Sequence, residues 1–169
     1  ALNWADWLAA RTNESVRLGT LHDGQVLLVH HVFRPDNSPQ MLEVGWLLPM
    51  HATAMGTVLL AYHPYLTAEL GNGALQRFSR CTITDLKLLA LELEHVQEQG
   101  WASCPEEFIE GETSFAAPIR DRQGVAVGAI AISGPTERLC EDAQPRSELV
   151  SYVREAAHTI SRDLGAVPW

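Results

Sequence analysis

The sequence predicts an α+β domain, in which an antiparallel sheet of about six strands is flanked by helices. Two observations lead to this fold class. First, β-branched and leucine-rich runs occur in pairs, and a short turn that contains glycine separates the two runs of each pair, as in β-hairpins. Second, runs with apolar residues at helical spacing occur at both ends of the chain and in its middle. Helices should therefore flank the sheet.

The first half of the chain is predicted to hold a helix, three strands and a second helix. Tryptophan and leucine recur at helical spacing over residues 1–11, which gives the leading helix. Residues 15–21 and 26–32 form the first hairpin, and residues 41–47 form a third strand. The second helix begins near Thr53, a fair N-cap, and ends before a proline.

The second half is predicted to hold the remaining elements. They are a short helix over 66–70, a helix N-capped by Thr84 and stopped by Gly100, strands over 101–103, 113–119 and 125–133, and a last helix from Pro145 to Gly165. No repeat, low-complexity tract or domain boundary interrupts them, so we expect a single domain over residues 1–169.

Composition excludes several classes of protein. With 46% hydrophobic and 20% charged residues the chain is globular, and no apolar run is long enough for a membrane helix, so we expect a cytoplasmic protein. Three cysteines at wide spacings predict reduced thiols. The net charge of −9 would repel a phosphate backbone, so any DNA would be contacted by another part of the protein.

The first turn of the second helix, Ala54-Met55-Gly56, has small side chains that leave backbone amides approachable. Because glycine destabilises a helix, something should need the space there. Either a ligand or a second backbone segment could occupy it, and close packing of the helix on its neighbours is at least as good an explanation as a ligand.

A resemblance to a known family lies in the same stretch. The run Pro49-Met50-His51-Ala52-Thr53-Ala54, with Gly56 and Leu59-Leu60-Ala61 after it, resembles the signature of the effector-binding domain of IclR-type bacterial transcription regulators. Further matches are Asp23-Gly24, Gly100-Trp101, Glu106-Glu107 before Gly111, Ala116-Ala117-Pro118, and Ile132-Ser133-Gly134-Pro135. The family frequently carries lysine where this chain has Thr57. The resemblance extends over nearly the whole chain and implies a GAF-like fold.

The last predicted strand has one face of small residues. Alternation places Ala129, Ala131 and Ser133 on this face, and the partner strand can bring Ser114 and Ala116 beside them. Such a face does not fill a core by itself, so a closely packed helix or a bound molecule must occupy the space. By resemblance, this face encloses the family's effector pocket together with the Ala54-Met55-Gly56 turn and the acidic loop around Glu107.

Twelve residues are therefore candidates for binding an effector. They are Met41, Leu47, His51, Ala54, Met55, Gly56, Glu107, Ser114, Ala116, Ala129, Ala131 and Ser133. Glu107 is the weakest of them, since three glutamates in one loop are more often solvated charge. His51 lies in the shared motif, although a hydrogen-bonded turn histidine is a better explanation for it than a metal ligand.

Metal and catalytic motifs are missing from the sequence. Seven histidines and three cysteines show no HExxH or CxxC spacing, and neither a G-x-S-x-G motif nor a phosphate-binding loop is present. We therefore predict no catalytic residue, no metal and no cofactor. A small hydrolase or transferase that uses Cys104 or Ser133 remains a minority alternative.

The resemblance implies a sensing function. We expect the C-terminal domain of a transcription regulator that binds a small organic acid or aromatic metabolite, forms a dimer or tetramer, and reaches DNA only through an N-terminal winged helix-turn-helix outside these residues. A GAF-like sensor attached to a kinase or cyclase is the main alternative.

Overall fold

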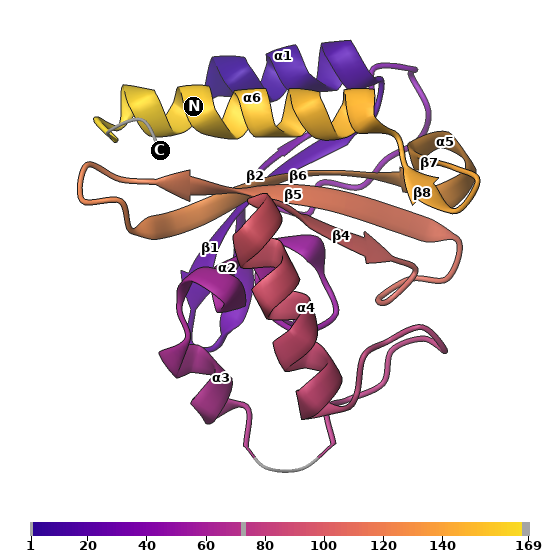
Figure 1. The fold of residues 1–169 in the computed structure, drawn as a ribbon. Helices are drawn as coiled ribbons and strands as arrows, with labels where there is room; N and C mark the ends of the chain where they lie inside the picture. The colour runs from indigo at the N-terminus through magenta and orange to yellow at the C-terminus, as the bar shows by residue number, and fades with distance from the viewer. Residues whose placement is uncertain (1, 72–73, 167–169) are drawn as a thin grey trace.

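The chain forms one main sheet with helices on both of its faces (Figure 1), as described by a computed structural model for residues 2–71 and 74–166. The helices are α1 (Leu2–Thr12), α2 (Ala54–Tyr62), α3 (Tyr65–Glu69), α4 (Leu86–Gln99), α5 (Thr136–Leu139) and α6 (Ser147–Asp163). The strands are β1 (Ser15–His22), β2 (Gln25–Val32), β3 (Leu47–Leu48), β4 (Ala102–Pro105), β5 (Glu112–Arg120), β6 (Ala126–Pro135), β7 (Cys140–Glu141) and β8 (Gln144–Pro145).

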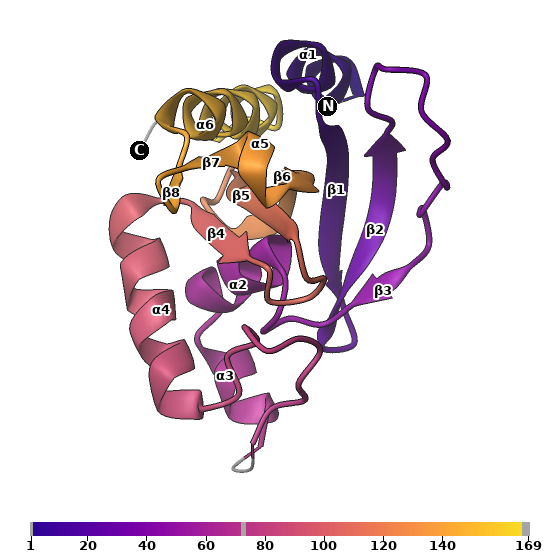
Figure 2. The same ribbon diagram turned by 90° about the vertical axis from the view of Figure 1, so that its right-hand side faces the viewer.

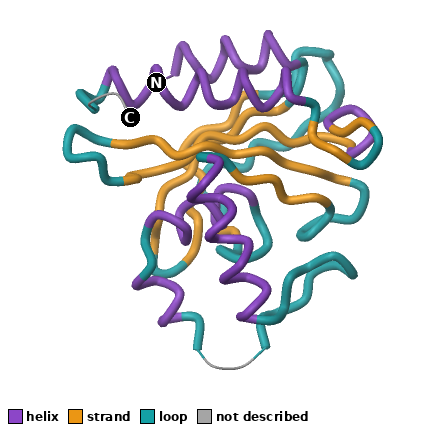
Figure 3. Tube along the Cα trace, in the orientation of Figure 1, coloured by secondary structure: helices purple, strands orange, loops and turns teal. Residues whose placement is uncertain are grey.

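The main sheet has six strands in the order β3-β2-β1-β6-β5-β4, and its neighbouring strands are antiparallel. The predicted α+β class with about six antiparallel strands is thereby confirmed. The tube view in Figure 3 shows that the sheet curls around one group of helices.

Two helical layers cover the two faces of the sheet. Helices α1 and α6 lie side by side on one face, and α2, α3 and α4 lie on the other (Figures 1 and 2). Each face has its own hydrophobic core. Ile130 and Ile132 of β6 point into the core under α1 and α6, while Ala129 and Ala131 point into the core around α2. The alternation that was predicted for this strand is therefore present.

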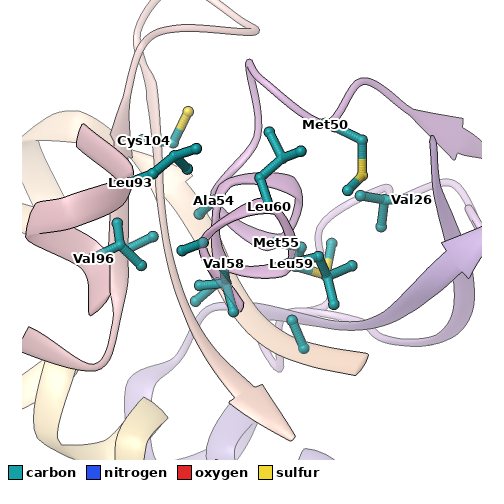
Figure 4. Close-up of a cluster of buried hydrophobic side chains, with 14 of the residues drawn as sticks. Val26, Met50, Ala54, Met55, Val58, Leu59, Leu60, Leu93, Val96 and Cys104 are labelled. Carbon is teal, nitrogen blue, oxygen red and sulfur yellow. The ribbon is translucent and has the colours of Figure 1, made fainter. Parts of the chain in front are cut away.

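Helix α2 forms the centre of the second core. Its residues from Ala54 to Ala61 are all buried, because the helix passes between the sheet, α4 and the segment before it. Figure 4 shows Met50 and Val26 on one side of α2, and Leu93 and Val96 on the other. The Thr53 hydroxyl accepts a hydrogen bond from the Gly56 N–H (3.1 Å), which confirms the predicted N-cap.

The predicted first residues of two helices are wrong. Asp85, and not Thr84, caps α4, because the Asp85 carboxylate accepts a hydrogen bond from the Lys87 N–H at 2.8 Å. Pro145 pairs with Cys140 in the small second sheet, so α6 starts only at Ser147.

The predicted strand over residues 41–47 is also wrong. Only Leu47 and Leu48 form a strand, opposite Leu27 and Val26 of β2, although the Gly45 N–H and the Trp46 carbonyl also bond the backbone of Leu28. Gly45 adopts a left-handed conformation (φ +92°), and the Trp46 N–H donates to the Glu43 carbonyl, so the chain turns there instead of extending. Residues 33–46 form a long connection along the outer edge of the sheet (Figure 2).

Candidate ligand-binding site

Small residues form two rows across the sheet on the face that is covered by α2. In one row Ala116 of β5 lies beside Ala131 of β6, and Arg17 of β1 follows on the other side of Ala131. In the next row Ser114 and Ser133 lie side by side. This is the predicted arrangement of the two strands, and it leaves space above the sheet because alanine and serine project so little.

A cavity of about 110 Å³ lies above these rows. The first turn of α2 covers it with Ala54 and Met55, and Ala131, Ser133 and Ser114 form its floor. Water needs only about 10–15 Å³ of such volume. The cavity therefore has room for a small organic molecule.

Apolar and polar groups occupy different parts of the cavity wall. The large apolar groups and Ala52 come from several segments of the chain, and they are Trp46, Leu48, Ala52, Met55, Cys104, Phe108 and Ile109. The charged groups are Arg17, Glu43 and Glu112. A mainly apolar hollow with a few convergent polar groups is typical of sites for small molecules.

Arg17 holds the polar part of the wall together. Its Nε donates to the Glu43 carboxylate at 2.5 Å, and its Nη1 donates to the Ser133 hydroxyl at 2.7 Å. Burial raises the pKa of the nearby Glu112 carboxyl, and the Arg17 charge opposes that rise. The cavity thus presents one guanidinium beside two carboxyl groups.

Gly56 does not face the cavity, because another backbone segment occupies the space beside it. A Cβ atom at this position would lie 2.5 Å from the Met50 Cα. The turn Ala54-Met55-Gly56 was expected to make room for either a ligand or a second backbone segment. At Gly56 it is the second backbone segment. Ala54 and Met55 do line the cavity, and their N–H groups belong to a helical turn whose amides have no partner within the helix.

The cavity brings together five of the twelve candidate residues, namely Ala54, Met55, Ser114, Ala131 and Ser133. Ala116 and Ala129 lie on the same face but are buried in the core around α2, so helix packing fills the space there. Met41 and Leu47 are exposed, at 68% and 47%. The His51 ring is buried and its Nε2 bonds the Gln76 carbonyl at 2.8 Å, away from the cavity.

Glu107 is buried, although an acidic loop residue would ordinarily be solvated. Its side chain lies in a second hollow, between α4, β4 and the start of α6. Burial raises the pKa of Glu107 to about 7, and the charge of Glu92 adds to this effect, while the neighbouring Cys104 side chain opposes it.

Neither suggested nucleophile is activated. The Cys104 thiol donates to the Ala52 carbonyl at 3.0 Å, and burial beside Glu107 raises its pKa, which keeps it protonated. The Ser133 hydroxyl accepts its hydrogen bond from Arg17, which is no general base. In the part of the chain that the structure describes, no cluster of three or more potential metal ligands occurs. Within residues 2–71 and 74–166, no helix combines the length and apolar character needed to cross a bilayer.

Arg17, Glu43, Trp46, Phe108 and Glu112 were not expected in the site. Arg17 could have been found from alternation, since a charged residue between Val16 and Leu18 must point to the opposite face of β1. The others lie on irregular segments or at a strand end. No periodic signal places them.

Comparison with known proteins gives consistent matches over the chain. The family model described as bacterial transcriptional regulator IclR C-terminal matches residues 1–162. The glycerol operon regulatory protein of Streptomyces griseus is 46% identical over 166 residues, which are 98% of this chain and 65% of that protein. The HTH-type transcriptional regulator KdgR of Escherichia coli K12 is 32% identical over 160 residues, 94% of this chain and 60% of that protein.

A solved structure agrees with these matches. An IclR homolog from Microbacterium hydrocarbonoxydans, crystallised in complex with 4-hydroxybenzoate, superposes with a TM-score of 0.85. It is 27% identical to this chain, and the match covers 97% of this chain and 66% of the other.

Proposed function

This chain belongs to the IclR family of bacterial transcriptional regulators, as their C-terminal domain, and from this premise we propose that its cavity binds the effector of a DNA-binding regulator. The single observation that carries the proposal is the cavity between the first turn of α2 and the floor around Ala131. A domain that only packed helices on a sheet would fill this space with side chains.

The effector is a small organic molecule, and a small organic acid or an aromatic metabolite fits the wall best. Trp46 and Phe108 supply aromatic surface for a ring, and Arg17 supplies donors for a carboxylate. The similar IclR homolog in complex with 4-hydroxybenzoate supports this class. Since another relative regulates a glycerol operon, small polyols and their acids also belong among the compounds to be tested.

Contact with DNA is assigned to residues outside this chain. The chain spans 65% of the Streptomyces griseus relative, and its net charge of −9 is unsuited to a phosphate backbone. We expect a winged helix-turn-helix to supply that contact in the bacterial cytoplasm. Effector binding would then alter operator binding if it favours one of two arrangements of the protein, by about 1–3 kcal/mol in typical cases.

Self-association as a dimer or tetramer is the second part of the proposal. Large apolar side chains are exposed along the outer edge of the sheet, at Val29, Phe33, Met41, Leu42, Val44, Trp46 and Leu47. Clusters of this kind often mark interfaces, and palindromic operators are matched by two-fold symmetric proteins. Light scattering during size-exclusion chromatography tests this part, and a uniform 18.6 kDa monomer would contradict it.

Thermal denaturation in the presence of candidate effectors tests the sensing function. A ligand at a hundredfold excess over its dissociation constant should stabilise the domain by about 2.7 kcal/mol, without being turned over. The panel contains small organic acids, 4-hydroxybenzoate and polyols.

Ala131→Leu places the added atoms in the cavity and should abolish the shift. Val127→Leu enlarges an exposed residue of the same strand, outside the cavity, and should keep it. A shift that survives Ala131→Leu in a folded variant would place the ligand elsewhere. A panel without any shift would count against sensing.

A further inference from the structure

We propose that Arg17 is the subsite for the negatively charged group of the effector, and that Glu43 is the protein's own competitor for this subsite. The proposal rests on the effector-binding function and adds a specific mechanism to it. An acidic effector must displace Glu43 from Arg17, whereas an uncharged molecule need not. Glu43 would therefore set both the affinity for acids and the response of the domain to them.

The geometry around Arg17 is that of a filled anion subsite. The Arg17 side chain is only 14% exposed, and its Nε lies 2.5 Å from a carboxylate oxygen of Glu43. The bonds to Glu43 and Ser133 use two of the five N–H donors that a guanidinium has, and the group borders the cavity. A carboxylate of a ligand would seek the same planar donor edge that Glu43 occupies.

The charges of the wall explain why competition is required. Arg17, Glu43 and Glu112 are the charged groups that line the cavity in the described part of the chain. With both carboxyl groups ionised, an acid would enter a cavity that already carries excess negative charge. Burial raises the pKa of Glu112, so this carboxyl becomes neutral more readily than an exposed one. Glu43 is then the negative charge that must move.

Glu43 is also the carboxyl group that can move. It lies between Leu42 and Val44, which are 59% and 45% exposed, on an irregular connection whose backbone bonds to β2 begin only at Gly45. Its side chain is 20% exposed, so rotation toward the solvent would bring the carboxylate into water. Glu112, in contrast, lies within the ladder of β5 opposite Pro135 and is fixed there.

Displacement of Glu43 would reach the end of α1 through His31. The Glu43 N–H donates to His31 Nδ1 at 3.2 Å, and His31 Nε2 lies 3.0 Å from the Ser15 hydroxyl. Because a backbone N–H can only donate, Nδ1 accepts, and the proton of the neutral ring is on Nε2, which donates to Ser15. Burial and the Arg17 charge lower the pKa of His31, which keeps the ring in this neutral form.

Ser15 is the first residue of β1 and follows the junction with α1. The preceding residue, Glu14, is buried and receives two hydrogen bonds from Arg138, at 2.7 and 2.9 Å. The junction is therefore held from both sides, by Arg138 and by the His31 bond. Rotation of the Glu43 side chain alone leaves its N–H on His31, so the relay requires the connection around Glu43 to move outward with it. The His31 ring then loses the donor on Nδ1, the second support weakens, and the position of α1 can respond to the contents of the cavity.

Calorimetric binding of matched acids and alcohols tests the competition. The probes are 4-hydroxybenzoate with 4-hydroxybenzyl alcohol, and glycerate with glycerol. Glu43→Gln keeps an amide oxygen for Arg17 but removes the charge. The substitution should lower the dissociation constant of an acid by about tenfold, which is within the usual range of coupling between sites. The dissociation constant of the matching alcohol should stay within about twofold of the wild-type value. Glu110→Gln changes the net charge equally at an exposed position outside the cavity and should change neither.

The outcomes separate the competition by Glu43 from the effector-binding function on which it rests. The competition would be overturned if Glu43→Gln bound the acid no more tightly than the wild type, or if Glu110→Gln gained as much affinity for it. Binding of the alcohol by the same proteins would still support the sensing function. If no variant binds any of the four probes at millimolar concentrations, sensing and competition fail together. Nitrogen NMR tests the relay, since saturation with an acid should remove the hydrogen bond to His31 Nδ1 and shift its resonance. An unshifted resonance would overturn the relay.

Discussion

Replacing Glu107 by glutamine should make the stability of the domain less dependent on pH. Glu107 is 7% exposed, and burial raises its pKa from 4.5 to about 7. Between these values the folded protein keeps a proton that the unfolded chain releases. The free energy of unfolding is therefore highest, as far as Glu107 is concerned, below about pH 4.5, where the carboxyl is neutral in both states. This contribution is lost as the pH rises through about 7.

The size of this loss follows from the two pKa values. Their separation corresponds to about 3 kcal/mol of destabilisation above pH 7, because each tenfold change in proton affinity is worth about 1.4 kcal/mol. Glutamine cannot ionise, so Glu107→Gln should gain on the order of 2–3 kcal/mol over the wild type at pH 8. At pH 4.5 the two proteins should be about equally stable.

Urea unfolding followed by tryptophan fluorescence measures this difference at both pH values. Glu110→Gln, at an exposed position of the same loop, is the control and should shift stability little at either pH. If Glu107→Gln changes the free energy of unfolding equally at pH 4.5 and pH 8, the carboxyl does not titrate as inferred. A loss of stability at pH 8 would refute the reasoning outright.

Two further substitutions test the supports of the site, each measured by urea unfolding. Gly56→Ala should destabilise by roughly 3 kcal/mol, although alanine favours helices, because its Cβ would overlap the Met50 backbone; a gain in stability would contradict this packing. Arg138→Ala should destabilise by about 2–3 kcal/mol, because it leaves the buried Glu14 carboxylate unpaired. Adding Glu14→Gln should recover part of the loss, and no recovery would show that the ion pair is not the cause.

The floor of the cavity could be predicted from the sequence because a β-strand fixes the direction of every side chain. Once β5 and β6 were recognised as a hairpin, alternation placed Ala131 and Ser133 on one face, and pairing placed Ser114 beside them. The same rule applies to β1, where Arg17 lies opposite Ala131. Secondary structure with a strict period thus carries information about which residues share a site.

The polar wall could not be predicted, because its residues lie where the chain has no period. Glu43 and Trp46 reach the cavity through the turn at Gly45, in a segment that resembles a strand by composition. Glu107 was expected in the loop near the cavity, but the loop folds so that its carboxyl is buried in the neighbouring hollow. Tertiary packing decided each of these positions.

The cavity persists because the helix above it cannot move down to close it. The Met50 backbone lies against Gly56 on one side of α2, and the missing side chain of Gly19 leaves space that the Met55 sulfur occupies, 3.1 Å from where a Cβ would be. These two contacts hold the first turn of α2 at a fixed height over the sheet. Beneath that turn lie Ala131, Ser114 and Ser133, whose short side chains leave the space between the sheet and the turn open. The two glycines therefore fix the helix, and the small residues of the floor provide the room for a ligand.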